Sequence, residues 1–301
     1  MQNRPSFLKI PALFLWTVVL ALFTAVLSAA PLKMLRTTVG QARFWSYGLL
    51  LTVAFLALHI YVLGFVIGAQ VILIGTFGEF EDHGQSLRRA AVLSVIVSSL
   101  AAASGIFLWA AFAKEDLYQL LLSWIGFFLK RAAETKIPVF EGLKPQALIY
   151  QLPSALVIFL ILSLALALIL ERPISRWTGQ VVERKAKLAD YKNPDFFIWI
   201  LILSVLGTFL HAGTKPLQVL SLNVLNVSIL AYFFQGLGVL GTYFEAFQIG
   251  LIWRLLWIII LVIQLPIVLS VVGVADYWLE FRQFLMRKAA QLKKKRIGEQ
   301  K

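Results

Sequence analysis

The chain has 301 residues, of which 60% are hydrophobic and only 14% are charged, and its mean hydropathy is +0.83. These values lie far outside the usage of soluble domains, so they exclude a water-soluble globular protein. The chain has no cysteine, which excludes disulfides, thiolate catalysis and thiolate-bound metal centres, and its formal net charge is +13.

Long apolar runs occupy most of the sequence. Several have 18 residues or more, enough for a helix to cross a hydrocarbon core about 30 Å thick. Because the runs are continuous rather than alternating, they favour helices. We therefore predict an all-α, polytopic transmembrane helical bundle of about seven spans, with a range of six to eight. The runs cover residues 11–30, 47–77, 90–113, 148–170, 196–212, 220–247 and 252–275.

The first two runs each allow two interpretations. The first has basic flanks and ends in Ala29-Ala30, as a signal peptide does, but Pro31 at the cleavage position favours a retained span. The second has 31 residues. We expect one long, bent helix there; the alternative is two short segments broken between Gly64 and Gly68.

Two groups of glycines are typical of close helix packing. Small residues at such spacings let membrane helices approach closely. An unwound segment that contacts a solute is the alternative for the second group. The groups are Gly64 with Gly68, and Gly236 with Gly238 and Gly241.

Few side chains offer catalytic or metal-binding chemistry. The sequence contains no P-loop, zincin helix, nucleophile elbow or dinucleotide fingerprint. Its three histidines are isolated from one another, so we expect no metal centre, no cofactor and no enzymatic activity. His59, on an apolar run, is either a structural histidine or a ligand or proton site. The acidic residues at 79–82 form either a solvated helix cap or a cation-binding mouth.

Residues 116–130 combine a narrow polar stripe with apolar residues on the remaining faces. This pattern predicts an amphipathic helix, and its apolar stretch is too short to span the bilayer. We expect it at the membrane interface, either packed along the bundle or docked to a partner subunit.

Amide side chains stand out in the last two runs. Asn223 and Asn226 share a helix face, whereas Asn226 and Gln235 lie 2.5 turns apart. Polar groups at membrane depth face partners or cavities, so these residues and Tyr232 are candidates either for a solute site or for interhelical hydrogen bonds. Asp276 and Arg282, six residues apart, are too far round one helix to pair and are assigned to capping and anchoring.

Basic segments set the predicted topology. The tail 282–301 and the loop 172–195 both carry an excess of Lys and Arg, which places both in the cytoplasm. Three single crossings between them would conflict with this, so we expect an extra turn at Gly236–Gly241 or at residues 264–266. The predicted organisation is one transmembrane domain, 1–281, in the cytoplasmic (inner) membrane, followed by a basic cytoplasmic tail, 282–301.

The basic tail has two candidate partners. Attraction to anionic inner-leaflet lipid contributes about 1 kcal/mol per basic residue near the surface. Nucleic-acid binding through counterion release would use the same charges. Attraction to lipid explains the basic pattern without a further partner, so we do not expect the tail to bind nucleic acid.

Two segments resemble one known family. The run from Asn226 through Tyr232, Gln235 and Gly236, and the ending Val272-Gly-Val-Ala-Asp276-Tyr-Trp-Leu-Glu-Phe-Arg282, are similar to the YybS-like family of predicted bacterial membrane proteins. That family is distantly similar to the S components of energy-coupling-factor transporters. The resemblance implies a helical bundle that captures a small solute and works with an ABC-type ATPase and a transmembrane coupling subunit.

Two functions are therefore expected from the sequence. The first is a non-enzymatic, solute-binding subunit of a small-molecule transporter, with Asn223, Asn226, Tyr232, Gln235 and His59 as candidate solute-contacting residues. The second is a membrane scaffold that recruits other membrane proteins through the helix at 116–130 and the basic tail. The first requires a bound solute and the second requires a stable protein complex.

Overall fold

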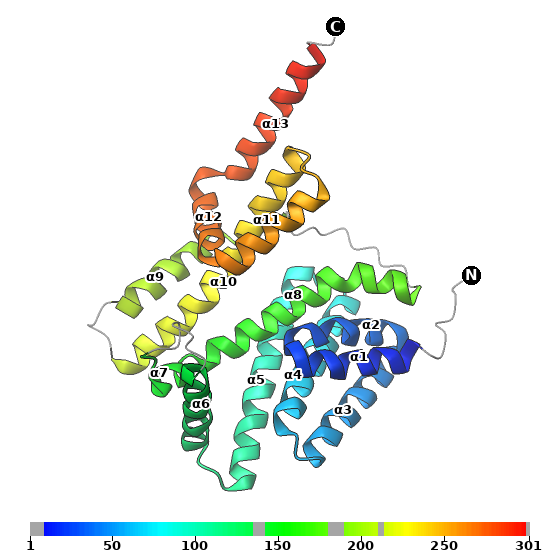
Figure 1. The fold of residues 1–301 in the computed structure, drawn as a ribbon, viewed down its shortest axis with the longest axis vertical. Helices are drawn as coiled ribbons and strands as arrows, with labels where there is room; N and C mark the ends of the chain where they lie inside the picture. The colour runs from blue at the N-terminus through cyan, green and yellow to red at the C-terminus, as the bar shows by residue number, and fades with distance from the viewer. Residues whose placement is uncertain (1–8, 135–141, 180–189, 210–213, 299–301) are drawn as a thin grey trace. The chain divides into compact units, whose positions relative to one another are not determined.

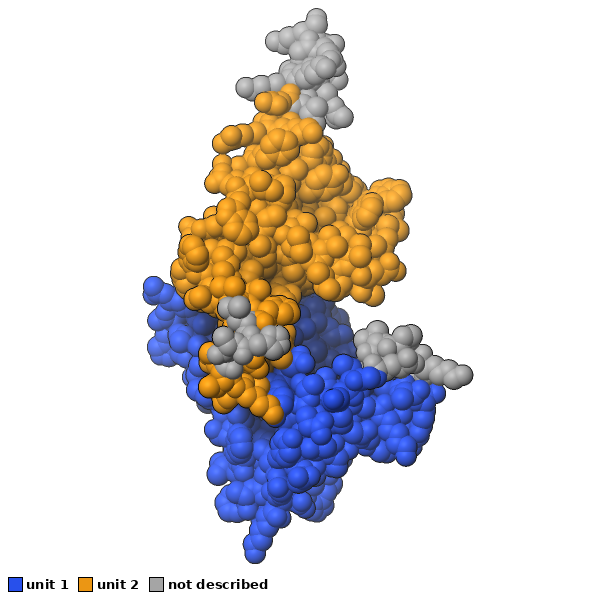
Figure 2. Space-filling view, turned by 90° about the vertical axis from the view of Figure 1, so that its left-hand side faces the viewer, with its two compact units in different colours: residues 1–183 blue, residues 184–301 orange. Residues whose placement is uncertain are grey.

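A computed structural model describes residues 9–134, 142–179, 190–209 and 214–298, with side chains described as far as residue 291. The chain forms two compact units, unit 1 of residues 1–183 and unit 2 of residues 184–301, coloured separately in Figure 2. The regular elements over the described residues are all helices, which confirms the predicted all-α class (Figure 1).

Five helical segments in the described residues are long and apolar enough to cross a membrane. A sixth is reached if one bent helix pair counts as a single span. A count of six is the lower limit of the expected range, and a count of five lies below it. The candidates are Lys9–Val39, Tyr61–Asp82, Leu87–Ala113, Leu152–Thr178 and Lys215–Ala246, and the bent pair is Leu251–Gln264 with Pro266–Leu279.

Unit 1 is built around helix α4, which supplies much of its buried core. Apolar side chains of α4 such as Ile67, Ile74 and Phe77 are fully buried. Helices α2, α3, α5 and α8 pack against α4 (Figure 1). The elements of unit 1 are α1 (Lys9–Thr24), a 3-10 turn (Ala25–Ser28), α2 (Ala29–Val39), α3 (Gln41–Ala57), α4 (Tyr61–Asp82), α5 (Leu87–Ala113), α6 (Leu117–Glu134), α7 (Pro145–Ile149) and α8 (Leu152–Thr178).

The second apolar run is two helices rather than one. The α3 helix ends at Ala57 and α4 begins at Tyr61, with His59 between them in a left-handed conformation (φ 59°). The expectation of one long, bent helix was wrong, and the break lies before Gly64. Because α3 and α4 fold back on each other, Gly64 and Gly68 face α3, where added Cβ atoms would meet Leu56 and Thr52 at 2.7 and 3.0 Å.

The amphipathic segment forms helix α6. Asp116 precedes α6, and its carboxylate accepts hydrogen bonds from the backbone N–H groups of Tyr118 and Gln119. This is the capping arrangement that starts a helix. The helix runs to Glu134, four residues beyond the expected end, and its placement at the membrane interface stays a prediction.

Unit 2 centres on α10, which packs against α9 and α12. An added Cβ on Gly236 would lie 1.9 Å from the carbonyl oxygen of Leu269, and one on Gly273 would lie 2.0 Å from that of Tyr232. The backbones of α10 and α12 therefore touch where these glycines meet. The elements of unit 2 are α9 (Phe197–Phe209), α10 (Lys215–Ala246), α11 (Leu251–Gln264), α12 (Pro266–Leu279) and α13 (Phe281–Gly298).

One of the two expected breaks is present in unit 2. Helices α11 and α12 meet at Leu265 with a bend of 101°, as predicted for residues 264–266. The stretch Gly236–Gly241 stays inside the continuous helix α10. Proline cannot donate the backbone hydrogen bond that would continue α11, so Pro266 starts a new helix instead.

Candidate functional site

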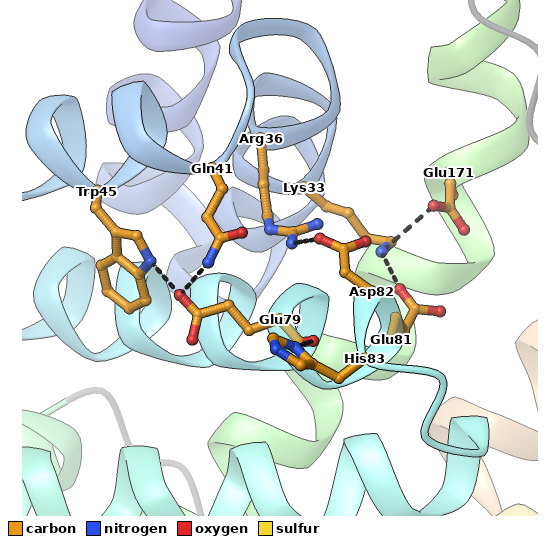
Figure 3. Close-up of polar contacts among 9 residues, drawn as sticks. All are labelled: Lys33, Arg36, Gln41, Trp45, Glu79, Glu81, Asp82, His83 and Glu171. Carbon is orange, nitrogen blue, oxygen red and sulfur yellow. Dashed lines mark hydrogen bonds and ion pairs between the residues drawn. The ribbon is translucent and has the colours of Figure 1, made fainter.

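A cluster of charged side chains lies in unit 1, where α2 passes the end of α4 and the last turns of α8. We call it the ionic cluster; it consists of Lys33, Arg36, Glu81, Asp82 and Glu171 (Figure 3). Lys33 and Arg36 stand three residues apart on α2, so they share one face of that helix. The acids come from α4 and α8, and the cluster therefore joins three helices.

Lys33 is the centre of the ionic cluster. Its ammonium nitrogen lies 3.2 Å from Glu81 Oε2 and 3.4 Å from Glu171 Oε1. The side chains of Lys33 and Glu171 are each only 4% exposed, so both charges have lost most of their water. The ammonium also lies 4.6 Å from the centroid of the Phe77 ring. Buried charges are tolerated only in such paired arrangements.

The guanidinium of Arg36 forms the second pair of the cluster, with Asp82. It also lies directly over Gly78, where an added Cβ would meet Arg36 Cζ at 1.9 Å. An alanine at this point of α4 would therefore require the Arg36 guanidinium to move. Beside the cluster, Glu79 accepts hydrogen bonds of 2.7 Å from the side chains of Gln41 and Trp45 (Figure 3).

These contacts account for the acidic group at 79–82. The protein's own cations on α2 pair with Glu81 and Asp82, and α3 supplies donors to Glu79. The arrangement joins α2 and α3 to the end of α4. Among the described residues, no group of three or more His, Asp or Glu side chains is placed to hold a metal ion.

A second buried polar group lies in unit 2. We call it the polar centre; it consists of Asn193, Gln235, Asp276 and Arg282. The Gln235 side chain, in a residue only 1% exposed, accepts a hydrogen bond from the backbone N–H of Asn193 (3.0 Å) and donates one to Asp276 Oδ2 (3.3 Å). It thus links the segment before α9 to α12.

Arg282, in the first turn of α13, closes the polar centre. Its Nε lies 3.3 Å from Asp276 Oδ2, and its Nη2 donates to the carbonyl oxygens of Tyr191 and Gln235. The expectation that Asp276 and Arg282 cannot pair was wrong. Helix α12 ends at Leu279, and Glu280 is left-handed (φ 45°), so the chain turns and brings Arg282 back towards Asp276.

In the polar centre, Oδ1 of Asp276 and Nδ2 of Asn193 are buried and have no hydrogen-bond partner among the described residues. Asp276 is 5% exposed and Asn193 is 7% exposed. A buried polar atom without a partner costs about 1–3 kcal/mol, so such atoms are rare and require an explanation. Here one is an acceptor and the other a donor, in residues that both bond to Gln235.

The structure separates the residues proposed from sequence as a solute site. Tyr232 and Gln235 are buried, and the Tyr232 ring lies 5.9 Å from that of Phe197. Asn223 is half-buried and donates to the carbonyl of Val219 in its own helix. Asn226 is likewise half-buried on α10. His59 lies in unit 1, exposed, and bonds to the Tyr61 hydroxyl.

Several residues of the ionic cluster and of the polar centre were not identified from the sequence. Lys33 and Arg36 carried a signal, because two basic residues directly follow the first apolar run. Glu171 also carried a signal, because it is an acidic residue directly after the fourth apolar run, 148–170. Asn193 carried no sequence signal, because its role depends on a contact with Gln235, which is 42 residues away in the chain.

Residues 10–277 match the family described as Predicted membrane protein (DUF2232). The chain belongs to this family. The YybS-like resemblance fits this membership, and both segments that carry it lie within or reach into the matched range. No curated protein and no solved structure matches the chain. The protein is therefore a member of a membrane protein family whose description states no activity.

Proposed function

We propose that the chain is a non-enzymatic membrane subunit that binds a small polar solute at the polar centre of unit 2. The observation that carries this proposal is the pair of unpartnered buried atoms, Asp276 Oδ1 and Asn193 Nδ2. A solute with one donor and one acceptor would satisfy both. Tyr232 and Gln235, two of the residues expected to contact a solute, lie in the same part of α10.

The charges of the polar centre favour a neutral solute. Arg282 already pairs with the carboxylate of Asp276, so a further cation would compete with a guanidinium, and an anion would meet the carboxylate. A hydroxyl or amide group needs neither charge. We therefore expect a small solute that carries an amide or a hydroxyl next to a hydrogen-bond acceptor.

The broken pair α11–α12 supports a role in transport. Discontinuous apolar helices are a recurrent feature of solute sites in transporters, because backbone that leaves the helix is tolerated where it lines a site. The 101° bend between these helices lies directly before Leu269 and Gly273, where α12 meets α10. In this proposal an ABC-type ATPase and a coupling subunit provide the energy, in a bacterial cytoplasmic membrane.

The test is native mass spectrometry of the protein purified in mild detergent from its own membrane, with proteomics of the same sample. Asn193→Asp removes the donor Nδ2 and keeps an oxygen at the position that accepts from Tyr191. We expect a small-molecule adduct on the wild-type protein that is lost in this variant. The matched control is Gln119→Glu, the same amide-to-acid change on exposed α6, which should keep the adduct.

A second function is favoured by the surface of α6. Four of its aromatic residues are exposed: Tyr118 at 42%, Trp124 at 49%, Phe127 at 63% and Phe128 at 57%. Such a surface fits either lipid or the helix of another membrane protein. A wild-type protein without adduct that copurifies with envelope-assembly proteins, and loses them on Phe127→Ser, would replace the solute-binding proposal with the scaffold.

A further inference from the structure

The N-terminal apolar segment folds back on itself. Helix α1 and helix α2 lie side by side, joined by the turn Ala25–Ser28, where Ala25 has a positive φ of 25° (Figure 1). At the start of α1, the Lys9 ammonium donates to the carbonyl of Thr178, the last residue of α8 (3.1 Å). On α2, Lys33 pairs with Glu171, two turns earlier in α8. Both arms of this hairpin therefore have their open ends beside the end of α8.

The turn of the hairpin lies half-way along its neighbours. Gln70, near the middle of α4, accepts a hydrogen bond from Ser28 and donates to the Ala25 carbonyl and, at 3.4 Å, to Ser163 in the middle of α8. From Ser163 to Thr178 is 15 residues, or about 22 Å of helix. Measured along α8, the turn therefore lies about 22 Å from the start of α1.

Neither arm is long enough to cross a bilayer. The arm α1 has 16 residues and α2 has 11, or about 24 Å and 16 Å of helix, whereas the hydrocarbon core is about 30 Å thick. Together they would suffice in one straight helix, but the fold-back prevents this. Leu22 and Phe23, just before the turn, are 64% and 81% exposed. Such apolar side chains at the tip fit hydrocarbon rather than water.

Gln70 satisfies a backbone carbonyl that a turn at membrane depth leaves without its helical partner. Backbone carbonyls that lose their helical partners cost several kcal/mol in hydrocarbon unless another group satisfies them. The Gln70 amide supplies that partner to Ala25, and its oxygen accepts from the Ser28 hydroxyl. Gln70 and Ser28 are both completely buried. The broken backbone is thus stabilised inside the protein, away from lipid.

We infer that residues 9–39 form a re-entrant hairpin, which enters the bilayer, turns at its middle and returns to the same face. The contacts of Lys9, Lys33 and Arg36 hold its two arms at that face, and Gln70 holds its tip. Helix α3 then starts from this face, because Gln41 and Trp45 near its beginning bond to Glu79 near the end of α4.

The charge distribution identifies this face as cytoplasmic. It gathers the basic residues at the start of α1, α3 and α5 and at the end of α8, and Lys and Arg near membrane helices remain on the cytoplasmic side. The N-terminus is accordingly placed in the cytoplasm, as is the start of the basic loop after α8. The residues are Lys9, Arg43, Arg88, Arg89, Arg172 and Arg176.

Single cysteines test the sidedness, and the natural chain contains none that would interfere. Ser6→Cys reports the N-terminus, Gln85→Cys reports the α4–α5 turn, and His59→Cys reports the opposite end of α4. We expect a membrane-impermeant maleimide to label Ser6→Cys and Gln85→Cys in inside-out vesicles and to lose that labelling in right-side-out vesicles. His59→Cys should show the reverse.

Labelling of Ser6→Cys together with His59→Cys would mean that residues 9–39 cross the membrane once, and would overturn the hairpin. Gln2→Cys is a second N-terminal reporter if the first variant does not fold. Depth is measured with a fluorophore on Phe23→Cys and lipids brominated at different acyl positions. Quenching should be strongest with bromine near the chain ends; strongest quenching near the headgroup would place the hairpin on the surface and contradict the inference.

Discussion

Lys33→Met is expected to lower the thermal unfolding midpoint of the protein in detergent by about 6 °C or more. The substitution keeps the length of the side chain but removes the ammonium that lies between Glu81 and Glu171. Removing one partner of a buried ion pair costs about 3 kcal/mol or more, and each kcal/mol corresponds to about 2 °C for a unit of this size. Fluorescence-detected size-exclusion chromatography after heating measures the midpoint without a cysteine-reactive dye.

Two further variants separate the ion pair from the loss of a lysine. Lys130→Met makes the same change at an exposed site on α6 and should leave the midpoint within about 1 °C, because exposed charges contribute little. Lys33→Met combined with Glu171→Gln removes both buried charges and should recover a large part of the loss. If the double variant is less stable than Lys33→Met alone, the pair is not the source of the effect.

The fold class and some of the helix packing could be predicted from sequence. Composition alone indicates membrane helices, because only such helices use continuous apolar runs of this length. Pro266 predicted the bend between α11 and α12, since a proline has no N–H to donate. These features depend on residues close to one another in the chain, where spacing is informative.

The turns and the buried polar groups depend on distant residues. The break at His59 follows no glycine or proline, and the turn at Ala25 needs Gln70, 45 residues later, to satisfy its carbonyl. Lys33 pairs with Glu171 from the far end of unit 1. A single sequence does not show which helices will be neighbours, so it could not predict these contacts.

In the polar centre, a contact within one short segment was also not predictable from the sequence. Asp276 and Arg282 are six residues apart, and on a continuous helix their side chains would diverge. The left-handed residue Glu280 changes the direction of the chain between them. Glutamate carries no strong signal for that conformation, which glycine or asparagine would have indicated.

Gly236→Ala is expected to separate α10 from α12 and to reduce the stability of unit 2 by about 2–3 kcal/mol. The added methyl carbon would lie 1.9 Å from the Leu269 carbonyl oxygen, which belongs to a helix backbone and cannot move alone. Overpacking of this kind costs about 1–3 kcal/mol. The shift would also move Gln235, the preceding residue, away from Asp276. Heating and size exclusion measure the stability, and native mass spectrometry measures any loss of the proposed adduct.

Gly126→Ala is the matched control, because its added Cβ has no neighbour within 4 Å on α6. Alanine is the better helix former, so this variant should be neutral or more stable by about 1 kcal/mol. Gly273→Ala probes the same crossing from α12, where the new Cβ would lie 2.0 Å from the Tyr232 carbonyl oxygen. Once the helices have separated, the second methyl meets little resistance, so Gly236→Ala and Gly273→Ala together should cost clearly less than the sum of the single changes. Full additivity would show that the two glycines act at independent contacts, and would contradict the backbone crossing on which the geometry of the polar centre depends.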